Sequence, residues 1–130
     1  MIAAPLLDSS CDTLVLYGDV PLVSSDSLKI LCKKSESPTL KVLTAIVEEQ
    51  TGYGRIIRNS NNLINKCVEE KDASKQEKSI NEINTGIILA PTESLKIWLE
   101  RIDNNNEQNE YYLPQIILHA NADKIPVVPI

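Results

Sequence analysis

An aspartate closes a stretch of apolar residues near the start of the chain, where LVLYG over residues 14–18 is followed by Asp19. Residues 13–17 form a run of strand length, as expected for a strand that is covered on both faces. In open α/β sheets, ligands bind beyond the carboxyl ends of the strands. A carboxylate there suits Mg²⁺, which prefers one or two carboxylates together with phosphate oxygens. Asp19 is therefore a candidate metal ligand, and capping of the turn before Pro21 is the structural alternative.

A second candidate is the segment TGYGR, in which Tyr53 stands between two glycines, the second of which is Gly54. Glycine allows the backbone to approach a ligand closely, so that its N–H groups can donate to that ligand. The alternative is an ordinary tight turn between two strands. Arg55, which follows, either neutralises a phosphate or pairs with a carboxylate of Glu69 or Glu70.

Asn84, in the segment EINTG, lies within a predicted strand. Asparagine is disfavoured in strands unless its amide finds partners. An amide that faces a pocket recognises sugar hydroxyls well. By contrast, the acidic segment VEEKDA, which contains Glu69, is typical of a solvated charge cluster, and the single histidine, His119, supports no catalytic triad.

Apolar runs, caps and turns predict strands that alternate with helices. Strands are expected over residues 13–17, 40–47, 51–58, 63–69, 83–89 and 125–130. Helices are expected over residues 26–33, 75–79, from 92 onward and over 111–120. In the helix from residue 92, one apolar face is predicted by the spacing of Leu95, Trp98, Leu99 and Ile102. Such alternation is typical of a single α/β domain with a mixed, mostly parallel sheet.

The composition excludes several classes of function. The net charge of -5 and the pI of about 4.9 argue against binding of nucleic acid, which requires clustered Lys and Arg. No segment has the basic start of a signal peptide or approaches the ~20 apolar residues of a membrane span, so a cytoplasmic protein without membrane contact is expected. Cys11, Cys32 and Cys67 are odd in number and widely spaced, which predicts reduced, half-buried thiols.

Six motifs occur in an order that resembles a known family: LYGDVPL, TGYGRI, VEEKDA, EINTGI, WL with NNN, and EYYL. The family is the N-terminal uridylyltransferase domain of the bacterial bifunctional enzymes that make UDP-N-acetylglucosamine. The resemblance runs from about Ile2 to Ile130. It implies a Rossmann-like nucleotidyltransferase fold and a role in supplying cell-wall precursors.

The resemblance implies a reaction and the residues on its nucleotide side. An oxygen of N-acetylglucosamine 1-phosphate attacks the α-phosphate of UTP and releases pyrophosphate, while Mg²⁺ offsets the charge of the transferring group. By resemblance, Asp19 is a Mg²⁺ ligand, and Tyr17 and Gly18 belong to the same loop. Positioning and charge stabilisation dominate in such a reaction.

The resemblance also implies roles on the sugar side. Gly54 offers its backbone to the sugar, Glu69 and Asn84 bind sugar hydroxyls, and Tyr112 forms part of the wall of the acetamido pocket. One residue departs from the family pattern. Pro114 stands where the family has a threonine that borders the acetamido group, which predicts an altered sugar pocket.

Other family features are not found in this sequence. They are the GxGTRM loop and the Pro-Lys that bind UTP phosphates, the residues that recognise uracil, a second Mg²⁺ ligand and the β-helix that transfers acetyl groups. We therefore expect the sugar-binding half of the domain, incomplete at the N-terminus and inactive alone, with an N-terminal fragment as a possible complement. A trimer is not expected, because the family trimerises through the β-helix. The alternatives are a non-catalytic remnant and an independent module that binds sugar phosphates.

Overall fold

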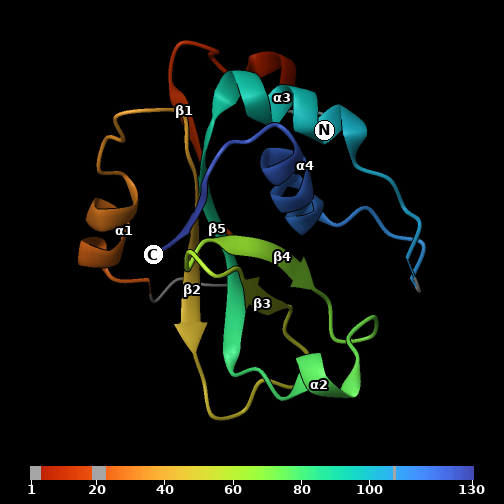
Figure 1. Ribbon diagram of the computed structural model, residues 1–130. Coiled ribbons are helices and arrows are strands. Elements are labelled where there is room, and N and C mark those ends of the chain that lie inside the picture. Colours follow the sequence, from red (N-terminus) through yellow and green to blue (C-terminus); the bar gives the residue numbers. More distant parts are fainter. Residues whose placement is uncertain (1–3, 19–22, 107) are drawn as a thin grey trace.

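The computed structural model describes residues 4–18, 23–106 and 108–130 (Figure 1). Its strands are β1 (Asp12–Val15), β2 (Leu40–Ile46), β3 (Arg55–Arg58), β4 (Ile64–Val68), β5 (Glu82–Pro91) and β6 (Val127–Pro129). Its α-helices are α1 (Ser25–Leu31), α2 (Lys75–Lys78), α3 (Thr92–Arg101) and α4 (Ile116–Ala122), and its 3-10 helices are η1 (Ala4–Leu6) and η2 (Leu113–Gln115). Every predicted strand and helix has a counterpart among these elements. Within the described ranges, no helix has the length and apolar character needed to cross a membrane.

The strands form one sheet in which β5 is central (Figure 1). β5 pairs antiparallel with β2, with β1 near its C-terminal end and with β3 near its start. β3 and β4 form an antiparallel hairpin, and β6 pairs parallel with β2. The sheet is mixed, as predicted, but the prediction that it is mostly parallel is wrong. β1 and β2 do run in the same direction, yet β5 lies between them and runs the opposite way. Alternation of strands and helices predicts strand direction, but it does not predict which strands are neighbours.

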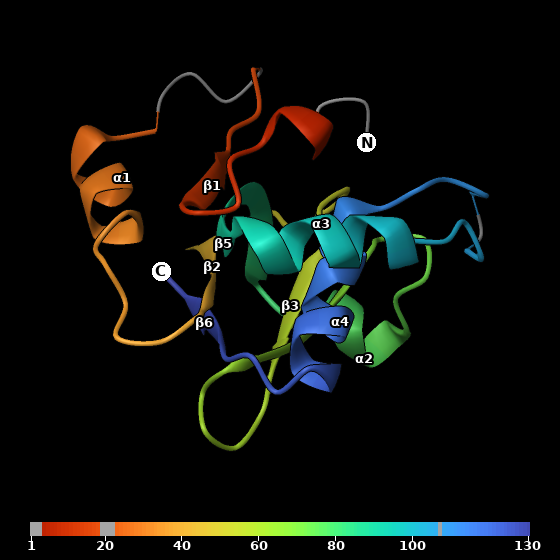
Figure 2. The ribbon, with the colours of Figure 1, turned by 90° about the horizontal axis from the view of Figure 1, so that it is seen from above.

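Helices cover both faces of this sheet, with α3 and α4 on one side and α1 on the other (Figure 2). The side chains of β5 alternate between the two faces. Ile88 and Ala90 pack in the core cluster under α3 and α4, whereas Ile87 and Leu89 pack with Leu31 of α1. Burial on both faces is why residues 87–90 of this strand are continuously apolar rather than alternating.

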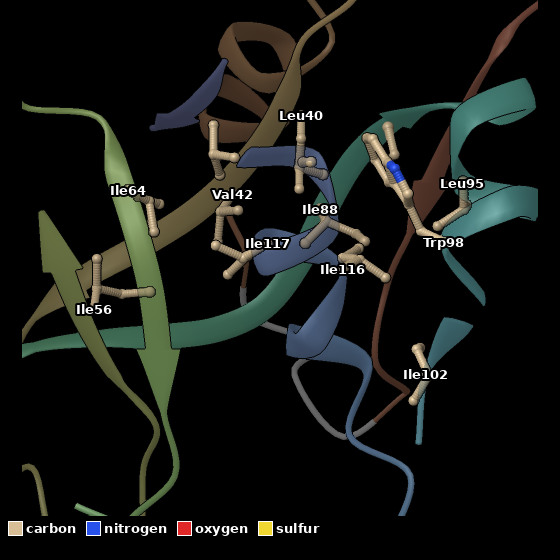
Figure 3. Close-up of a cluster of buried hydrophobic side chains, with 13 residues drawn as sticks. Leu40, Val42, Ile56, Ile64, Ile88, Leu95, Trp98, Ile102, Ile116 and Ile117 are labelled. Atoms are coloured by element: carbon tan, nitrogen blue, oxygen red, sulfur yellow. The ribbon is translucent and has the colours of Figure 1, made fainter. Parts of the chain in front are cut away.

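The larger core is built by α3 and α4 against the sheet (Figure 3). Leu95 and Trp98 of α3 are buried in it, as is Ile102 directly after the helix, which confirms the predicted apolar face. Trp98 also donates a hydrogen bond from its indole Nε1 to Asp123 at 2.9 Å. This bond, together with those from Arg101, lowers the pKa of the Asp123 carboxyl. The contact fixes the end of α4 against α3.

The last helical segment begins later than predicted. The predicted helix over residues 111–120 is divided into η2 and α4, and Tyr111 and Tyr112 precede both. Pro114 lies in the first turn of η2, where its missing N–H costs least. The two tyrosines therefore stand on an extended segment, and they border the pocket described next.

Candidate functional site

A pocket of about 350 Å³ lies where several loops meet beside β5. It is lined by the chain after β1, the loop between β2 and β3, the chain after β4, the middle of β5 and the segment before η2. Its volume is within the ~300–1,000 Å³ typical of small-molecule sites. Five of the six predicted substrate-binding residues line it: Tyr17, Gly54, Glu69, Asn84 and Tyr112. Residues far apart in the sequence are thus brought together as a single site.

The structure defines the residues predicted on the nucleotide side of the site less well. Gly18 is exposed and is not among the residues that line the pocket. Asp19 lies outside the described residues, so its predicted role as a Mg²⁺ ligand is not tested. Among the described residues, no group of three or more His, Cys, Asp or Glu side chains could hold a metal ion. A Mg²⁺ bound through one carboxylate and substrate phosphates would not need such a group.

The segment Asn84-Thr85-Gly86 lines the pocket and is held by hydrogen bonds. The Asn84 side-chain oxygen accepts from the Gly86 N–H at 3.0 Å, and the Asn84 N–H donates to the Gly54 carbonyl at 2.9 Å. Thr85 donates its hydroxyl to the Leu43 carbonyl at 2.6 Å. These bonds fix the Asn84 amide at the pocket, where a strand asparagine finds the partners it requires.

Gly86 supports Tyr17, a function that the sequence pattern did not reveal. Gly86 has a φ of +81°, and a Cβ built on it would lie 1.6 Å from Cε2 of Tyr17. The tyrosine ring therefore lies directly against the glycine backbone. Any side chain at this position would displace the ring and strain the backbone.

Replacing Gly86 with alanine is therefore expected to lower the free energy of unfolding by about 1–3 kcal/mol. Urea denaturation monitored by circular dichroism measures this loss. Gly18→Ala is the matched control, because its φ is outside the left-handed region and a Cβ there would meet nothing within 4 Å. The control should stay within about 0.5 kcal/mol of the original protein. Equal stability of the two variants would contradict the role of Gly86.

Gly54 and Glu69 are in direct contact. A Cβ at Gly54 would lie 2.8 Å from the Cys67 sulfur and 3.0 Å from a Glu69 carboxylate oxygen. Burial, and then the Glu69 charge, raise the pKa of the Cys67 thiol to about 12, while a hydrogen bond with Asn84 opposes this. Cys67 is thus a neutral packing residue behind the site. All three cysteines are free, as predicted, but Cys11 and Cys32 are exposed rather than half-buried.

Glu69 and Glu70 have different environments, so the acidic segment is not simply a solvated cluster. Burial and the Asp72 charge raise the pKa of Glu69, and the Arg55 charge partly offsets them. Glu70 accepts from Arg55 at 2.6 Å and from the Gly52 N–H at 3.4 Å. Arg55, which is 1% exposed, also donates to the Tyr53 carbonyl. Of the two roles left open for Arg55, the structure supports pairing, and the partner is Glu70.

Tyr112 stands between this pocket and a neighbouring one of about 340 Å³. Its hydroxyl is buried, and no partner for it is found in the described part of the chain. Burial, followed by the charges of Glu110, Asp72 and Glu69, raises the pKa of this phenol. A buried hydroxyl without a protein partner is suited to a bond with a ligand or water. Pro114 lines both pockets as well, and the altered sugar pocket expected from it stays a prediction.

Known relatives match almost the whole chain. The bifunctional protein GlmU of Bordetella petrii is 52% identical over 128 residues, which are 96% of this chain and 28% of that protein. The bifunctional proteins GlmU of Herminiimonas arsenicoxydans and Cupriavidus necator are 49% and 50% identical, each over 98% of this chain and 28% of the relative. The chain thus spans little more than a quarter of the length of these relatives. No model of a known protein family matches it.

Proposed function

Since this chain belongs to the GlmU family over the segment that it shares with these proteins, we propose that it forms the sugar-phosphate side of a uridylyltransferase site. Its ligand in this proposal is N-acetylglucosamine 1-phosphate. The observation that carries the proposal is the convergence of Tyr17, Gly54, Glu69, Asn84 and Tyr112 on one pocket. Neither the relatives nor the pocket favours an independent regulatory module.

The pocket offers hydrogen-bonding groups of complementary kinds. The Glu69 carboxylate accepts from sugar hydroxyls, while the Asn84 amide and the Tyr112 hydroxyl can both donate and accept. The close packing of Gly54 against Glu69 leaves the backbone of the loop near the ligand. Such groups orient the sugar phosphate, so that its phosphate oxygen is held in the geometry needed for attack.

The charge of the ligand requires a cation that the pocket walls do not supply. No Lys or Arg is among the described residues that line the pocket, and Arg55 is already paired with Glu70. We propose that Asp19 holds Mg²⁺ beside the phosphate and that UTP is the second substrate. When bound, Mg²⁺ would neutralise phosphate charge. Turnover of UTP would further require a phosphate-binding loop of the GxGTRM type, which is not in this sequence.

Isothermal titration calorimetry of the chain with N-acetylglucosamine 1-phosphate tests this proposal. Binding is expected in the presence of Mg²⁺ and should weaken strongly when Mg²⁺ is removed. Asn84→Ala is expected to weaken binding about fivefold to tenfold, the contribution of roughly one hydrogen bond. Asn61→Ala, at an exposed asparagine in the turn between β3 and β4, is the matched control and should bind normally.

Two outcomes would count against the proposal in different ways. If the original chain does not bind the sugar phosphate with Mg²⁺ present, the proposed ligand is wrong. If Asn84→Ala folds and binds as well as Asn61→Ala, the pocket is not the binding site. With UTP added, the chain alone is expected to release no pyrophosphate.

A further inference from the structure

All four tyrosines of this chain line one pocket. Tyr17, Tyr53, Tyr111 and Tyr112 come from three separate segments, yet each contributes to the pocket at the candidate site. The chain contains no phenylalanine, and its single tryptophan, Trp98, is fully buried in the core. Every aromatic residue outside the core is therefore gathered at this pocket.

Three of these rings are open to solvent, and one of them, Tyr17, is 43% exposed and packs against the backbone of Gly86. Tyr53 is 49% exposed and Tyr111 is 62% exposed, on the loop between β2 and β3 and on the segment before η2, respectively. A single exposed apolar side chain is ordinary. Two further exposed rings, on separate segments that line the same pocket as the half-buried Tyr112, give this pocket exposed aromatic surface next to its polar groups.

We propose that Tyr53 and Tyr111 bind the sugar ring of the ligand through its apolar C–H face and so determine affinity for the sugar. This inference rests on the proposed function. A pyranose carries hydroxyls around its edge and C–H groups on its faces, so it needs both kinds of contact. In this proposal, Glu69 and Asn84 form hydrogen bonds with the hydroxyls at the edge of the sugar, and the tyrosine rings pack against the C–H groups of one face. A tyrosine is suited to this place because its ring is rigid and its hydroxyl end tolerates water.

The two rings are expected to act on the sugar and not on the phosphate. Replacing either tyrosine with alanine should weaken binding of N-acetylglucosamine 1-phosphate about two- to tenfold, the range for an aromatic contact. Phenylalanine at either position keeps the ring and should bind within about twofold of the original chain.

Calorimetry with Mg²⁺ present tests this on the full chain, with N-acetylglucosamine 1-phosphate, inorganic phosphate and UTP as separate ligands. The variants are Tyr53→Ala, Tyr111→Ala and their phenylalanine counterparts. Ile30→Ala is the matched control, because Ile30 is a 59% exposed apolar residue of α1, on the other face of the sheet. Thermal unfolding of each variant should match that of the control. Loss of binding only for the alanine variants and only with the sugar phosphate supports the proposal.

Several results would overturn it. If the phenylalanine variants lose as much affinity as the alanine variants, the hydroxyls act and not the ring faces. If UTP binding falls while sugar-phosphate binding does not, the rings serve the base. If the original chain binds the sugar phosphate and the alanine variants bind it equally well, this inference fails while the proposed function stands. If the original chain does not bind it at all, both fail.

Discussion

Replacing Glu70 with alanine is expected to lower the free energy of unfolding by about 2–4 kcal/mol. Its carboxylate lies 2.6 Å from the Arg55 guanidinium, and the Arg55 side chain is only 2% exposed. Without the carboxylate, the guanidinium remains buried without its ion-pair partner, and only the Glu69 charge still acts on it. The Glu70 side chain is 27% exposed, so water replaces part of the lost contact and the cost is less than for a fully buried pair.

A double variant separates this cause from a general loss of packing. Arg55→Met combined with Glu70→Met removes both charges of this pair, so it should be more stable than Glu70→Ala alone. Urea denaturation measures the free energy of unfolding of the original chain, of Glu70→Ala and of the double variant. Glu48→Ala, at an exposed glutamate after β2, is the control and should change stability by no more than about 0.5 kcal/mol. A double variant less stable than Glu70→Ala would show that the pair contributes packing and not charge compensation.

The Arg55–Glu70 pair also matters for the pocket, because it holds the loop that carries Gly54. Arg55 donates to the Tyr53 carbonyl, and Glu70 accepts from the Gly52 N–H. The pair thus joins the loop between β2 and β3 to the chain after β4, and both segments line the pocket. We therefore expect Glu70→Ala to weaken sugar-phosphate binding as well as stability, although Glu70 does not itself line the pocket.

Local sequence patterns predicted the elements well and their neighbours poorly. The i, i+3 and i+7 spacing of Leu95, Trp98 and Ile102 identified a core face, because helix periodicity alone determines which side chains share a side. The apolar run of residues 13–17 predicted a strand covered on both faces, and this is wrong: β1 is only half-buried, and Leu16 and Tyr17 after it are exposed. An apolar run is found in parallel and in antiparallel strands alike, so the pattern could not reveal that β5 runs opposite to β1 and β2.

The residues of the site were easier to predict than the contacts that hold them. Asn84 and Gly54 were recognisable because an asparagine in a strand and a glycine between polar turn residues both require explanation. The partner of Arg55 could not be recognised from the sequence, because Glu69 and Glu70 are adjacent and differ only in the side of the chain that they face. The contact of Gly86 with Tyr17 joins β5 to the chain after β1, and nothing local to either residue indicates it. Asp19, Mg²⁺, UTP and a complementing N-terminal fragment stay predictions.

Glu69 should reduce the stability of the fold while it strengthens binding. Its pKa is raised above the ordinary value of 4.5, first by burial and then by Asp72. Between 4.5 and the raised value, the folded state binds more protons than the unfolded state, so stability falls as pH rises through this window. Above the raised pKa, the carboxylate is ionised in the folded state and lowers the free energy of unfolding by its full amount. Glu69→Gln removes this charge and is expected to raise the unfolding temperature at neutral pH.

The same replacement is expected to weaken binding of N-acetylglucosamine 1-phosphate about ten- to a hundredfold, because hydrogen bonds to a charged group are the stronger kind. Calorimetry with Mg²⁺ at several pH values measures the ratio of the two affinities, which cancels the titration of the ligand itself. That ratio should be largest at neutral pH and should shrink as pH falls through the raised pKa and Glu69 becomes protonated. Glu48→Gln, at an exposed position, should leave both stability and binding unchanged.

A residue that only supports the fold would give a different result. Its replacement would lower the unfolding temperature, and the affinity ratio would not depend on pH. If Glu69→Gln raises stability and lowers affinity, and both effects depend on pH with the titration of Glu69, then Glu69 is identified as a ligand-binding carboxylate.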